Sequence, residues 1–539
     1  MQGQMMHYPL TIGHFLERAE TLFPKVEVVS RLPDRSLHRY TYGEFASRAR
    51  KLASALLKLG LKDGDRVGTL MWNHYAHLEA YFGIPIAGGV LHTLNLRLHP
   101  ADLAYIIEHA GDRFVIVDDV LLPLWEKVAP LVENVERVIV VPLTGKPVPE
   151  GFLDYEQTIA PAPELEAFRI QGEEQALGMC YTSGTTGRPK GVVYSHRAVV
   201  LHSLASALPD ALNLSQRDVL LPVVPMFHVN AWGLPFTATM TGTKQVLPGP
   251  YLDPESLLDL YERERVTATA GVPTIWLGIL QALEKEPDRW KLVPGMRMVV
   301  GGSAAPEAMI RAFDRFGLRV IHAWGMTETT PLGTVSYLKS YLEALPEDEK
   351  YRLRAKQGLP VPLVEARGWG EAGEIPWDGR TMGELQVRGP WIAERYYRLP
   401  EGADKWTEDG WFRTGDVVTI DPEGYIEIVD RTKDLVKSGG EWISSVQLEN
   451  ALMGHPAVAE AAVIAVPHPK WQERPLAVVV LKEGASATEE ELKAFLEPKF
   501  AKWWIPDRIV FVEEIPRTSA GKFLKAKLRE RFKDFRWEG

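Results

Sequence analysis

The sequence predicts an α/β fold, with a large multi-subdomain N-terminal domain on mostly parallel sheets and a small α+β C-terminal domain. Short β-rich runs alternate with helical segments over most of the chain, as in parallel sheets covered by helices. The pattern changes after Asp430, and no long flexible linker marks that change. With 539 residues, of which 45% are hydrophobic, more than one core is expected. We therefore predict domains at residues 1–429 and 436–539, joined by a short hinge at 430–435.

Four runs rich in β-branched residues are the predicted strands of the large domain: 113–118, 137–141, 267–271 and 297–300. Asp253 followed by Pro254 starts a predicted helix that reaches roughly Arg265, because Asp is a good N-cap and proline fits the first helical position. Ala305-Pro306 opens a second helix, which Gly317 closes. The residues 301–303 therefore form a strand-to-helix turn, where ligands often bind.

The C-terminal part reads as a compact α+β unit. Residues 459–466 and 476–481 are predicted strands. Thr488 and Glu491 form a capping box before a helix predicted at 492–500.

Composition excludes some functions. A formal net charge of -10 and a pI near 5.9 disfavour general binding to nucleic acid. The first ten residues lack the basic start and apolar run of a signal peptide, and the single cysteine cannot form an internal disulfide. We therefore expect a reduced, cytoplasmic protein. Cys180 lies in an apolar run, which favours a buried structural thiol over a nucleophile.

The most apolar stretch, residues 219–240, contains three prolines together with His228 and Asn230. These residues are poorly suited to a membrane-spanning helix. We predict a buried strand and a pocket wall there, with no transmembrane segment.

The strongest chemical signal is the loop Tyr181-Thr-Ser-Gly-Thr-Thr-Gly-Arg-Pro-Lys-Gly191. Its glycines let backbone N–H groups approach phosphate, its hydroxyls add donors, and Lys190 adds positive charge. It is not a Walker A loop, because the Gly-Lys-Ser/Thr order is missing. The loop therefore predicts phosphate binding of another kind.

This loop resembles the signature of the acyl-adenylate-forming superfamily, and further motifs of that superfamily follow in order. They are Pro225-Met-Phe-His-Val-Asn230, Gly301-Gly-Ser-Ala-Ala-Pro306, Ala323-Trp-Gly-Met-Thr-Glu328, Trp411-Phe-Arg-Thr-Gly-Asp416, Asp430-Arg-Thr-Lys-Asp-Leu435 and Pro516-Arg-Thr-Ser-Ala-Gly-Lys522. The resemblance implies two half-reactions. A carboxylate attacks the α-phosphate of ATP to give acyl-AMP and pyrophosphate, and a thiol, normally that of CoA, then displaces AMP.

The resemblance also implies roles for individual residues. Lys522 is expected to bridge the carboxylate and the α-phosphate, and then to leave before the thiol approaches. This requires a mobile C-terminal domain that rotates about the hinge at Asp430 and Arg431. Thr182 and Glu328 are the expected Mg²⁺-positioning pair, and Asp416 is the expected acceptor for the ribose hydroxyls.

The remaining implied nucleotide contacts come from the loop, from the segment around Trp324 and from the residues after the hinge. Trp324 replaces the usual Tyr and is expected to stack on adenine, while Ala323 replaces the usual Gly. The other residues in this set are Ser183, Gly184, Thr185, Thr186, Gly187, Lys190, Gly302, His322, Thr327, Lys433, Lys437 and Trp442.

The segment Lys437 to Ser445 resembles that of bacterial medium- and long-chain fatty acyl-CoA synthetases. His228, Trp232, Gly302 and the run 271–280 are assigned to the acyl pocket and its gate, and His228 also to the catalytic set. Long-chain fatty acids are favoured, with medium-chain or short thio- or aryl-substituted acids, and transfer to a carrier protein, as alternatives. The resemblance further suggests a homodimer, and a transient membrane-surface contact stays open.

Overall fold

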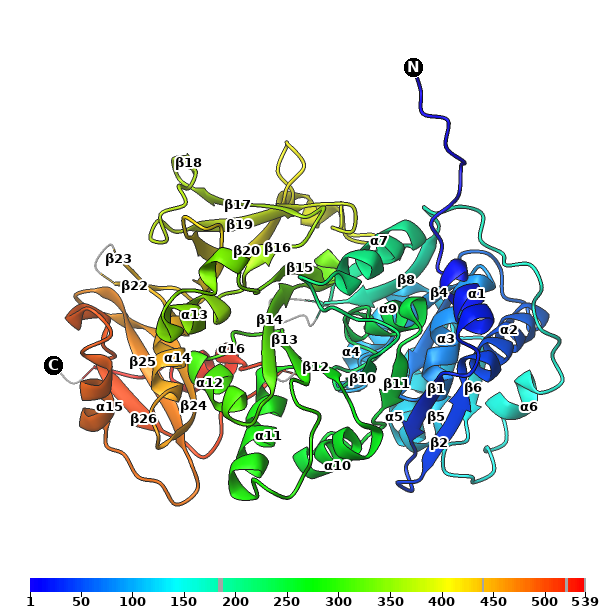
Figure 1. Cartoon of the computed structure of the whole chain (residues 1–539), viewed down its shortest axis with the longest axis horizontal. Coiled ribbons are helices and arrows are strands. Elements are labelled where there is room, and N and C mark those ends of the chain that lie inside the picture. The colour runs from blue at the N-terminus through cyan, green and yellow to red at the C-terminus, as the bar shows by residue number, and fades with distance from the viewer. Residues whose placement is uncertain (183–187, 439–440, 519–521, 538–539) are drawn as a thin grey trace.

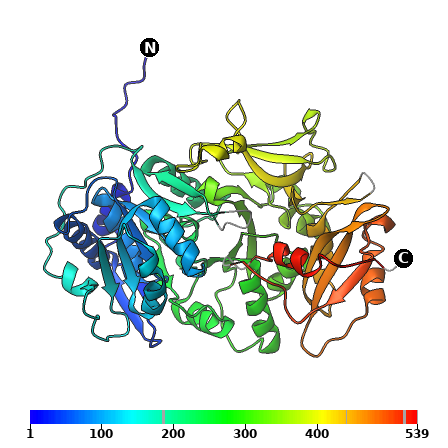
Figure 2. The ribbon, with the colours of Figure 1, turned by 180° about the vertical axis from the view of Figure 1, so that it is seen from behind.

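The computed structural model describes residues 1–182, 188–438, 441–518 and 522–537. Two large sheets lie side by side in the N-terminal domain, a smaller sheet lies above them, and the C-terminal domain packs at one end (Figure 1). In the view from behind, the C-terminal segment in orange and red again borders the green part of the N-terminal domain (Figure 2). The predicted fold class is confirmed.

The first sheet has nine strands in the order β16-β15-β14-β13-β12-β10-β11-β1-β2. Its central pairs, from β14 to β1, are parallel, whereas the pairs at both edges are antiparallel. The strands are β1 (Glu27–Arg31), β2 (Leu37–Thr41), β10 (Val219–Pro222), β11 (Lys244–Leu247), β12 (Ala268–Gly271), β13 (Arg297–Val300), β14 (Arg319–Gly325), β15 (Leu332–Val335) and β16 (Leu359–Pro360). Helices α9 (Leu234–Thr241), α10 (Pro254–Glu264), α11 (Pro273–Lys285) and α12 (Glu307–Arg315) belong to the same stretch of chain.

The second sheet has seven strands in the order β7-β6-β5-β3-β4-β8-β9, parallel except for the pair β8–β9. They are β3 (Arg66–Leu70), β4 (Val90–Thr93), β5 (Asp112–Asp118), β6 (Arg137–Val141), β7 (Leu153–Asp154), β8 (Ala176–Tyr181) and β9 (Gly191–Ser195). Helices of this region are α1 (Gly13–Leu22), α2 (Tyr42–Lys58), α3 (Tyr75–Ile86), α4 (Pro100–Ala110), α5 (Leu122–Val128), α6 (Tyr155–Ile159) and α7 (His196–Ala207).

A third, antiparallel sheet follows, with the order β18-β17-β19-β20-β21. Its strands are β17 (Glu365–Gly370), β18 (Gly373–Glu374), β19 (Gly383–Arg388), β20 (Phe412–Ile420) and β21 (Ile426–Arg431), and α13 (Glu347–Arg354) precedes it. The last strand ends at the predicted hinge, so this sheet connects the two domains.

The C-terminal domain has its own sheet and its own apolar core. Its elements are β22 (Val436–Ser438), β23 (Glu441–Ile443), α14 (Ser445–Met453), β24 (Val458–His468), β25 (Gln472–Leu481), α15 (Glu489–Leu496), β26 (Arg508–Phe511) and α16 (Lys525–Arg531). The capping box at Thr488 is present. The helix predicted at 492–500 is wrong in its bounds, because it begins at the cap and ends before Pro498, which cannot continue a helix.

The stretch 219–240 begins with the predicted buried strand, which is β10, but sequence analysis did not predict the helices that follow this strand. After β10 it contains α8 (Val229–Trp232) and α9. Hydrophobic periodicity does not reveal these helices because most of the stretch is buried, so no polar face marks them. No helix in the described ranges is long and apolar enough to cross a membrane.

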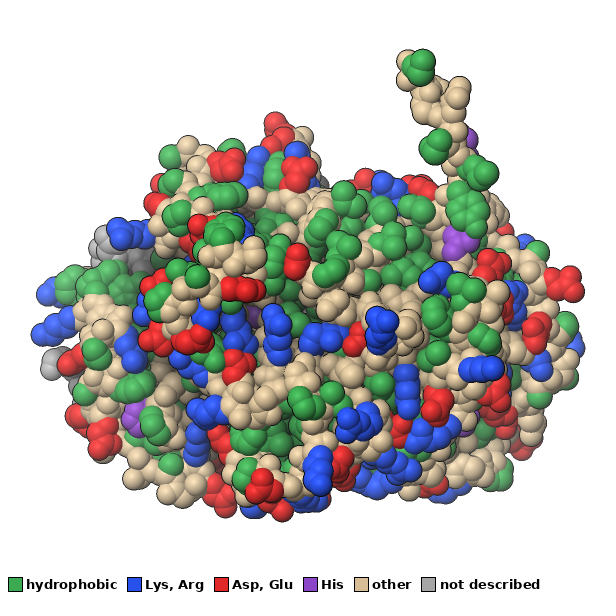
Figure 3. Space-filling model, viewed as in Figure 1, with side chains coloured by type: hydrophobic (Ala, Val, Ile, Leu, Met, Phe, Trp, Pro, Cys, Tyr) green, Lys and Arg blue, Asp and Glu red, His purple; other side chains and the backbone are tan. Residues whose placement is uncertain are grey.

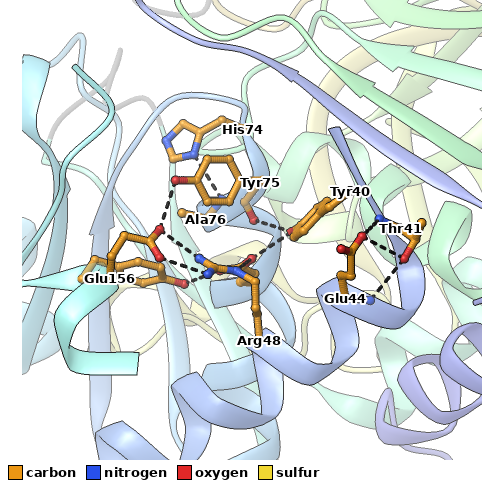
Figure 4. A network of polar contacts seen from close by, with 10 residues as sticks. Tyr40, Thr41, Glu44, Arg48, His74, Tyr75, Ala76 and Glu156 are labelled. Atoms are coloured by element: carbon orange, nitrogen blue, oxygen red, sulfur yellow. Dashed lines mark hydrogen bonds and ion pairs between the residues drawn. The ribbon is translucent and has the colours of Figure 1, made fainter. Parts of the chain in front are cut away.

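A buried polar network ties together the helices at the start of the chain (Figure 4). Glu79 on α3 is fully buried and accepts hydrogen bonds from Arg48 Nε at 2.7 Å and from the hydroxyls of Tyr40 and Tyr155, each at 2.9 Å. Arg48 also pairs with Glu156 on α6 at 2.9 Å. Burial raises the pKa of Glu79, and Arg48 opposes this rise. The network stabilises the packing of α2 against α3 and α6.

On the face shown in Figure 3, acidic and basic side chains are interspersed, and the N-terminal end of the chain, where residues 1–9 are exposed, extends away from the body.

Candidate active site

Two adjoining cavities, of about 200 and 280 Å³, lie where the N-terminal domain meets the C-terminal domain. Both are lined by Gly302 after β13, by Ala323 and Trp324 in β14, by Arg431 at the end of β21 and by Lys522. The carboxyl ends of neighbouring parallel strands meet at one edge of a sheet, which explains why the turn at 301–303 and β14 reach the same place. Most of the predicted site residues are thus brought together.

Lys522 reaches this junction from the C-terminal domain. Its backbone is fixed by two hydrogen bonds with Thr518, from Thr518 N to Lys522 O at 2.7 Å and from Lys522 N to Thr518 Oγ1 at 3.1 Å. Gly302 has a positive φ of 85°, and a Cβ there would lie 3.5 Å from Cε of the lysine. Desolvation, followed by the charge of Arg431, lowers the pKa of Lys522 to about 8. A bound anion would therefore favour the protonated ammonium form of this side chain.

Glu328, three residues after the end of β14, lines the first cavity. It is 6% exposed, and Oε1 accepts a hydrogen bond from the hydroxyl of Tyr396 at 2.7 Å. Lys190 Nζ lies 5.0 Å from the centre of the Tyr396 ring. Two hydrogen bonds hold Thr182 against Lys190: Thr182 N donates to the carbonyl oxygen of Lys190 at 2.9 Å, and Lys190 N donates to Thr182 Oγ1 at 3.1 Å. Hydroxyl, carboxylate and ammonium groups thus face one cavity.

Asp416 lies in the second cavity and is 2% exposed. Arg431 Nε lies 2.7 Å from its Oδ1. The indole N–H of Trp324 donates to Oδ2 at 2.9 Å. Sequence analysis predicts that Trp324 stacks on adenine, but nothing in the sequence indicates this hydrogen bond, which joins residues 92 positions apart.

His322 and Ala323 line the second cavity together with Gly302. His322 Nδ1 lies 3.0 Å from the carbonyl oxygen of Ala355. Burial lowers the pKa of His322 to about 4, so the imidazole is neutral near pH 7. Thr327 is buried in the first cavity, and its carbonyl oxygen accepts from the hydroxyl of Tyr194 at 2.8 Å.

The apolar end of the first cavity is shaped by a left-handed turn. Val229, Asn230, Ala231 and Trp232 have φ between 46° and 56°. Such a run costs about 1–2 kcal/mol per non-glycine residue, so surrounding contacts must hold it. The amide oxygen of Asn230 lies 3.3 Å from Thr93 Oγ1 and 3.4 Å from Cys180 Sγ.

Cys180 is therefore a buried partner of this turn, as its predicted structural role requires. The turn presents Val229 and Trp232 to the cavity, where they meet Leu212, Val299, Pro331 and Leu332. Desolvation and the charges of Lys522 and Arg97 lower the pKa of His228, which lines the same cavity, to about 4.

Some predicted residues cannot be placed in this way. Ser183, Gly184, Thr185, Thr186 and Gly187 lie outside the described residues, as does the side chain of Trp442. Lys433 lines the second cavity, whereas Lys437 is exposed on β22 and lines neither cavity, so its role stays a prediction.

Sequence analysis missed several cavity residues, among them the polar side chains of Arg188, Tyr396 and Lys405. Arg188 stands inside the phosphate-binding motif, so its charge was an available signal. Tyr396 and Lys405 lie in a stretch without a quoted motif, and only the fold brings them to Glu328 and Phe412. Within the described ranges, no group of three or more His, Cys, Asp or Glu side chains forms a metal site.

Comparison with known families gives two matches. Residues 16–397 match the AMP-binding enzyme family, and residues 447–522 match the AMP-binding enzyme C-terminal domain. The first match lies within the N-terminal domain and the second within the C-terminal domain.

Several characterised proteins are similar over nearly their full length. A long-chain fatty-acid–CoA ligase of Thermus thermophilus is 55% identical over 98% of this chain and 97% of its own. A 3-methylmercaptopropionyl-CoA ligase of Ruegeria lacuscaerulensis is 46% identical, over 99% of both chains. A medium-chain fatty-acid–CoA ligase of Ectopseudomonas oleovorans is 45% identical, over 99% and 98%. The crystal structure of the anthranilate–CoA ligase AuaEII with anthranoyl-AMP superposes with a TM-score of 0.87 at 25% identity, covering 98% of this chain and 99% of that one.

Proposed function

The chain belongs to the AMP-binding enzyme family, and from this premise we propose that it is a fatty-acid–CoA ligase with a preference for long-chain acids. It converts the acid and ATP to acyl-AMP and pyrophosphate, and it transfers the acyl group to CoA with release of AMP. The 55% identity to a long-chain ligase over almost the whole chain supports this reaction and this substrate class.

The observation that carries the proposal is the convergence of Lys522 with Glu328 and Asp416 on adjoining cavities. Adenylation joins two anions, a carboxylate and a phosphate, and its barrier falls when a cation lies between them. Lys522 enters from the C-terminal domain at the position where the cavities meet. We assign it the role of bridging the carboxylate and the α-phosphate.

We assign the other polar groups to binding either the phosphates or the nucleoside. Thr182, Lys190 and the loop that follows Thr182 bind the phosphates, with Arg188 as a further donor. Asp416 accepts the ribose hydroxyls, and Gly302, His322, Ala323 and Trp324 border the adenine. His228, which lines the first cavity together with Trp232 and Lys522, is assigned as a contact for the acid.

Mg²⁺ fits the first cavity. Thr182 and Glu328 offer hard oxygen donors, and ATP and water supply the remaining ligands that a Mg²⁺ ion requires. When bound, the ion neutralises charge on the phosphates. Tyr396 holds the carboxylate of Glu328 in its orientation through the hydrogen bond of 2.7 Å.

Residues 430–435 are proposed as the hinge between domains 1–429 and 436–539. Asp430 is fully buried and accepts a hydrogen bond from Ser445 N, at the start of α14, at 2.7 Å. Its backbone pairs with Val417 in the N-terminal domain. One residue thus contacts both domains, which suits a pivot that releases Lys522 before the thiol enters.

The preferred length of the acyl chain depends on the apolar end of the first cavity. The ring of Trp232 packs against Gly301, where a Cβ would lie 3.0 Å from its Cη2. We propose that Trp232 closes the apolar end of this cavity and that a long acyl chain requires its ring to move. A medium-chain acid or a short thio-substituted acid is the second candidate, because two of the similar ligases use such acids.

The test is ATP–pyrophosphate exchange over straight-chain acids from acetate to palmitate, followed by AMP release on addition of CoA. Lys522→Ala is the control and should abolish exchange. Maximal exchange with acetate would refute the fatty-acid assignment, and AMP release that requires an added carrier protein would refute the use of CoA.

A cytoplasmic homodimer completes the proposal. A buried free thiol and the use of ATP and CoA support a reducing compartment. Sedimentation at micromolar concentration tests the dimer, and a monomeric mass would contradict it.

A further inference from the structure

Trp324 differs from the tyrosine usual at its position, and its indole nitrogen contacts Asp416. We propose that Trp324 is a positioning residue that orients Asp416 for a ligand with a vicinal diol. The inference rests on the proposed function, because it takes Asp416 as the group that binds ribose.

Two side-chain donors reach the Asp416 carboxylate in the described part of the chain. Arg431 Nε binds Oδ1 at 2.7 Å, and Trp324 Nε1 binds Oδ2 at 2.9 Å. A carboxylate offers about four lone-pair positions, so one acceptor position remains on each oxygen. Two neighbouring hydroxyls match this arrangement, and a ribose presents them at C2′ and C3′.

The two donors differ in where they lie and in how exposed they are. Arg431 ends β21 beside the connection to the C-terminal domain, and its side chain is 40% exposed. Trp324 belongs to β14 inside the N-terminal domain and is 7% exposed. If the C-terminal domain rotates about residues 430–435, Arg431 can leave Asp416 while Trp324 stays. The indole N–H then remains to orient a buried carboxylate that water barely reaches.

The indole is held in this orientation by the adjacent strand. A Cβ at Gly333, in β15, would lie 2.4 Å from Cζ3 of Trp324. Gly333 is therefore required for space, since the ring occupies the volume that a side chain would need. Apolar residues of the third sheet, including Leu385 and Phe412, pack around the same tryptophan. The N–H has little freedom to turn away from Asp416.

The experiment compares Trp324→Phe with a matched control by titration calorimetry with ATP and with 2′,3′-dideoxy-ATP. Trp290→Phe is the control, because Trp290 is also 7% exposed and its Nε1 donates to Asp259 at 2.7 Å, outside the cavities. We expect Trp324→Phe to bind ATP about tenfold more weakly, the lower range for a hydrogen bond to a charged group. Its affinity for the dideoxy nucleotide should stay within about twofold, and Trp290→Phe should match the wild type with both.

Asp416→Ala and the double variant complete the design. If Trp324 acts through Asp416, adding Trp324→Phe to Asp416→Ala should cause no further loss for ATP. Equal weakening of both nucleotides by Trp324→Phe, or additive losses in the double variant, would overturn the inference in favour of stacking or packing alone. A wild-type protein that binds ATP without pyrophosphate exchange would instead refute the proposed function.

Discussion

Lys522 should take up a proton when ATP binds, and the uptake should depend steeply on pH. Burial and the neighbouring Arg431 lower its pKa to about 8 in the free protein. Contact with triphosphate adds negative charge, which favours the ammonium and raises the pKa. A lysine whose pKa rises on binding is partly neutral before and charged afterwards, so protons enter from solution between the two pKa values.

The number of protons taken up on ATP binding follows from the pKa of Lys522 in the free protein and in the complex. If the phosphates restore the ordinary pKa of 10.5, then at pH 8.5 the protonated fraction rises from about one quarter to almost one, an uptake of about 0.75 proton. At pH 7 about nine tenths of the lysines are already charged, so the uptake falls to about 0.1 proton. ATP affinity should therefore weaken as the pH rises through 8.

The assay is titration calorimetry of ATP and Mg²⁺ at pH 7.0 and 8.5, in pairs of buffers with different ionisation enthalpies. The slope of observed enthalpy against buffer enthalpy gives the number of protons exchanged. Lys522→Gln serves as the control, because it keeps a polar side chain but cannot titrate. The reasoning is refuted if wild type and Lys522→Gln exchange the same number of protons at pH 8.5.

Three further predictions address separate parts of the molecule. Tyr396→Phe removes the hydrogen-bond donor to Glu328 and should slow pyrophosphate exchange about tenfold. The control Tyr341→Phe removes a similar hydrogen bond to Glu423 at the surface and should leave the exchange rate unchanged. Equal exchange rates in the two variants would show that Glu328 does not need to be oriented. Trp232→Ala should raise kcat/KM for palmitate relative to octanoate about fourfold, the value of one additional buried methylene at about 0.8 kcal/mol, and an unchanged ratio would place the chain-length limit elsewhere. Glu79→Gln leaves Arg48 without its buried carboxylate partner and should lower the free energy of unfolding of the N-terminal domain, measured in urea, by about 3 kcal/mol. The control Glu394→Gln, in an exposed ion pair, should have almost no effect on this free energy. A decrease below about 1 kcal/mol for Glu79→Gln would contradict the stabilising role of the network.

Much of the fold was accessible from the sequence because its signals are local. The strand at 137–141 and the helix that begins at Pro254 have the predicted bounds within one residue, since strand composition and an Asp-Pro start act over a few neighbours. In the stretch 219–240 the predicted strand is present as β10, but the helices after it were not predicted. Where most side chains are buried, periodicity does not distinguish helix from strand, and a left-handed turn is set by contacts with distant residues such as Thr93.

The sequence by itself determined the reaction class, because the phosphate-binding loop and the motifs around Glu328, Asp416 and Lys522 are short and contiguous. Only the tertiary structure decided which side chains meet: Tyr396 with Glu328, and Trp324 with Asp416. Hydrogen bonds between residues this far apart depend on how strands of different sheets pack, and packing is a property of the whole core. The loop at residues 181–191 thus predicted nucleotide binding from the sequence, whereas the contacts that orient Glu328 and Asp416 are established only by the fold.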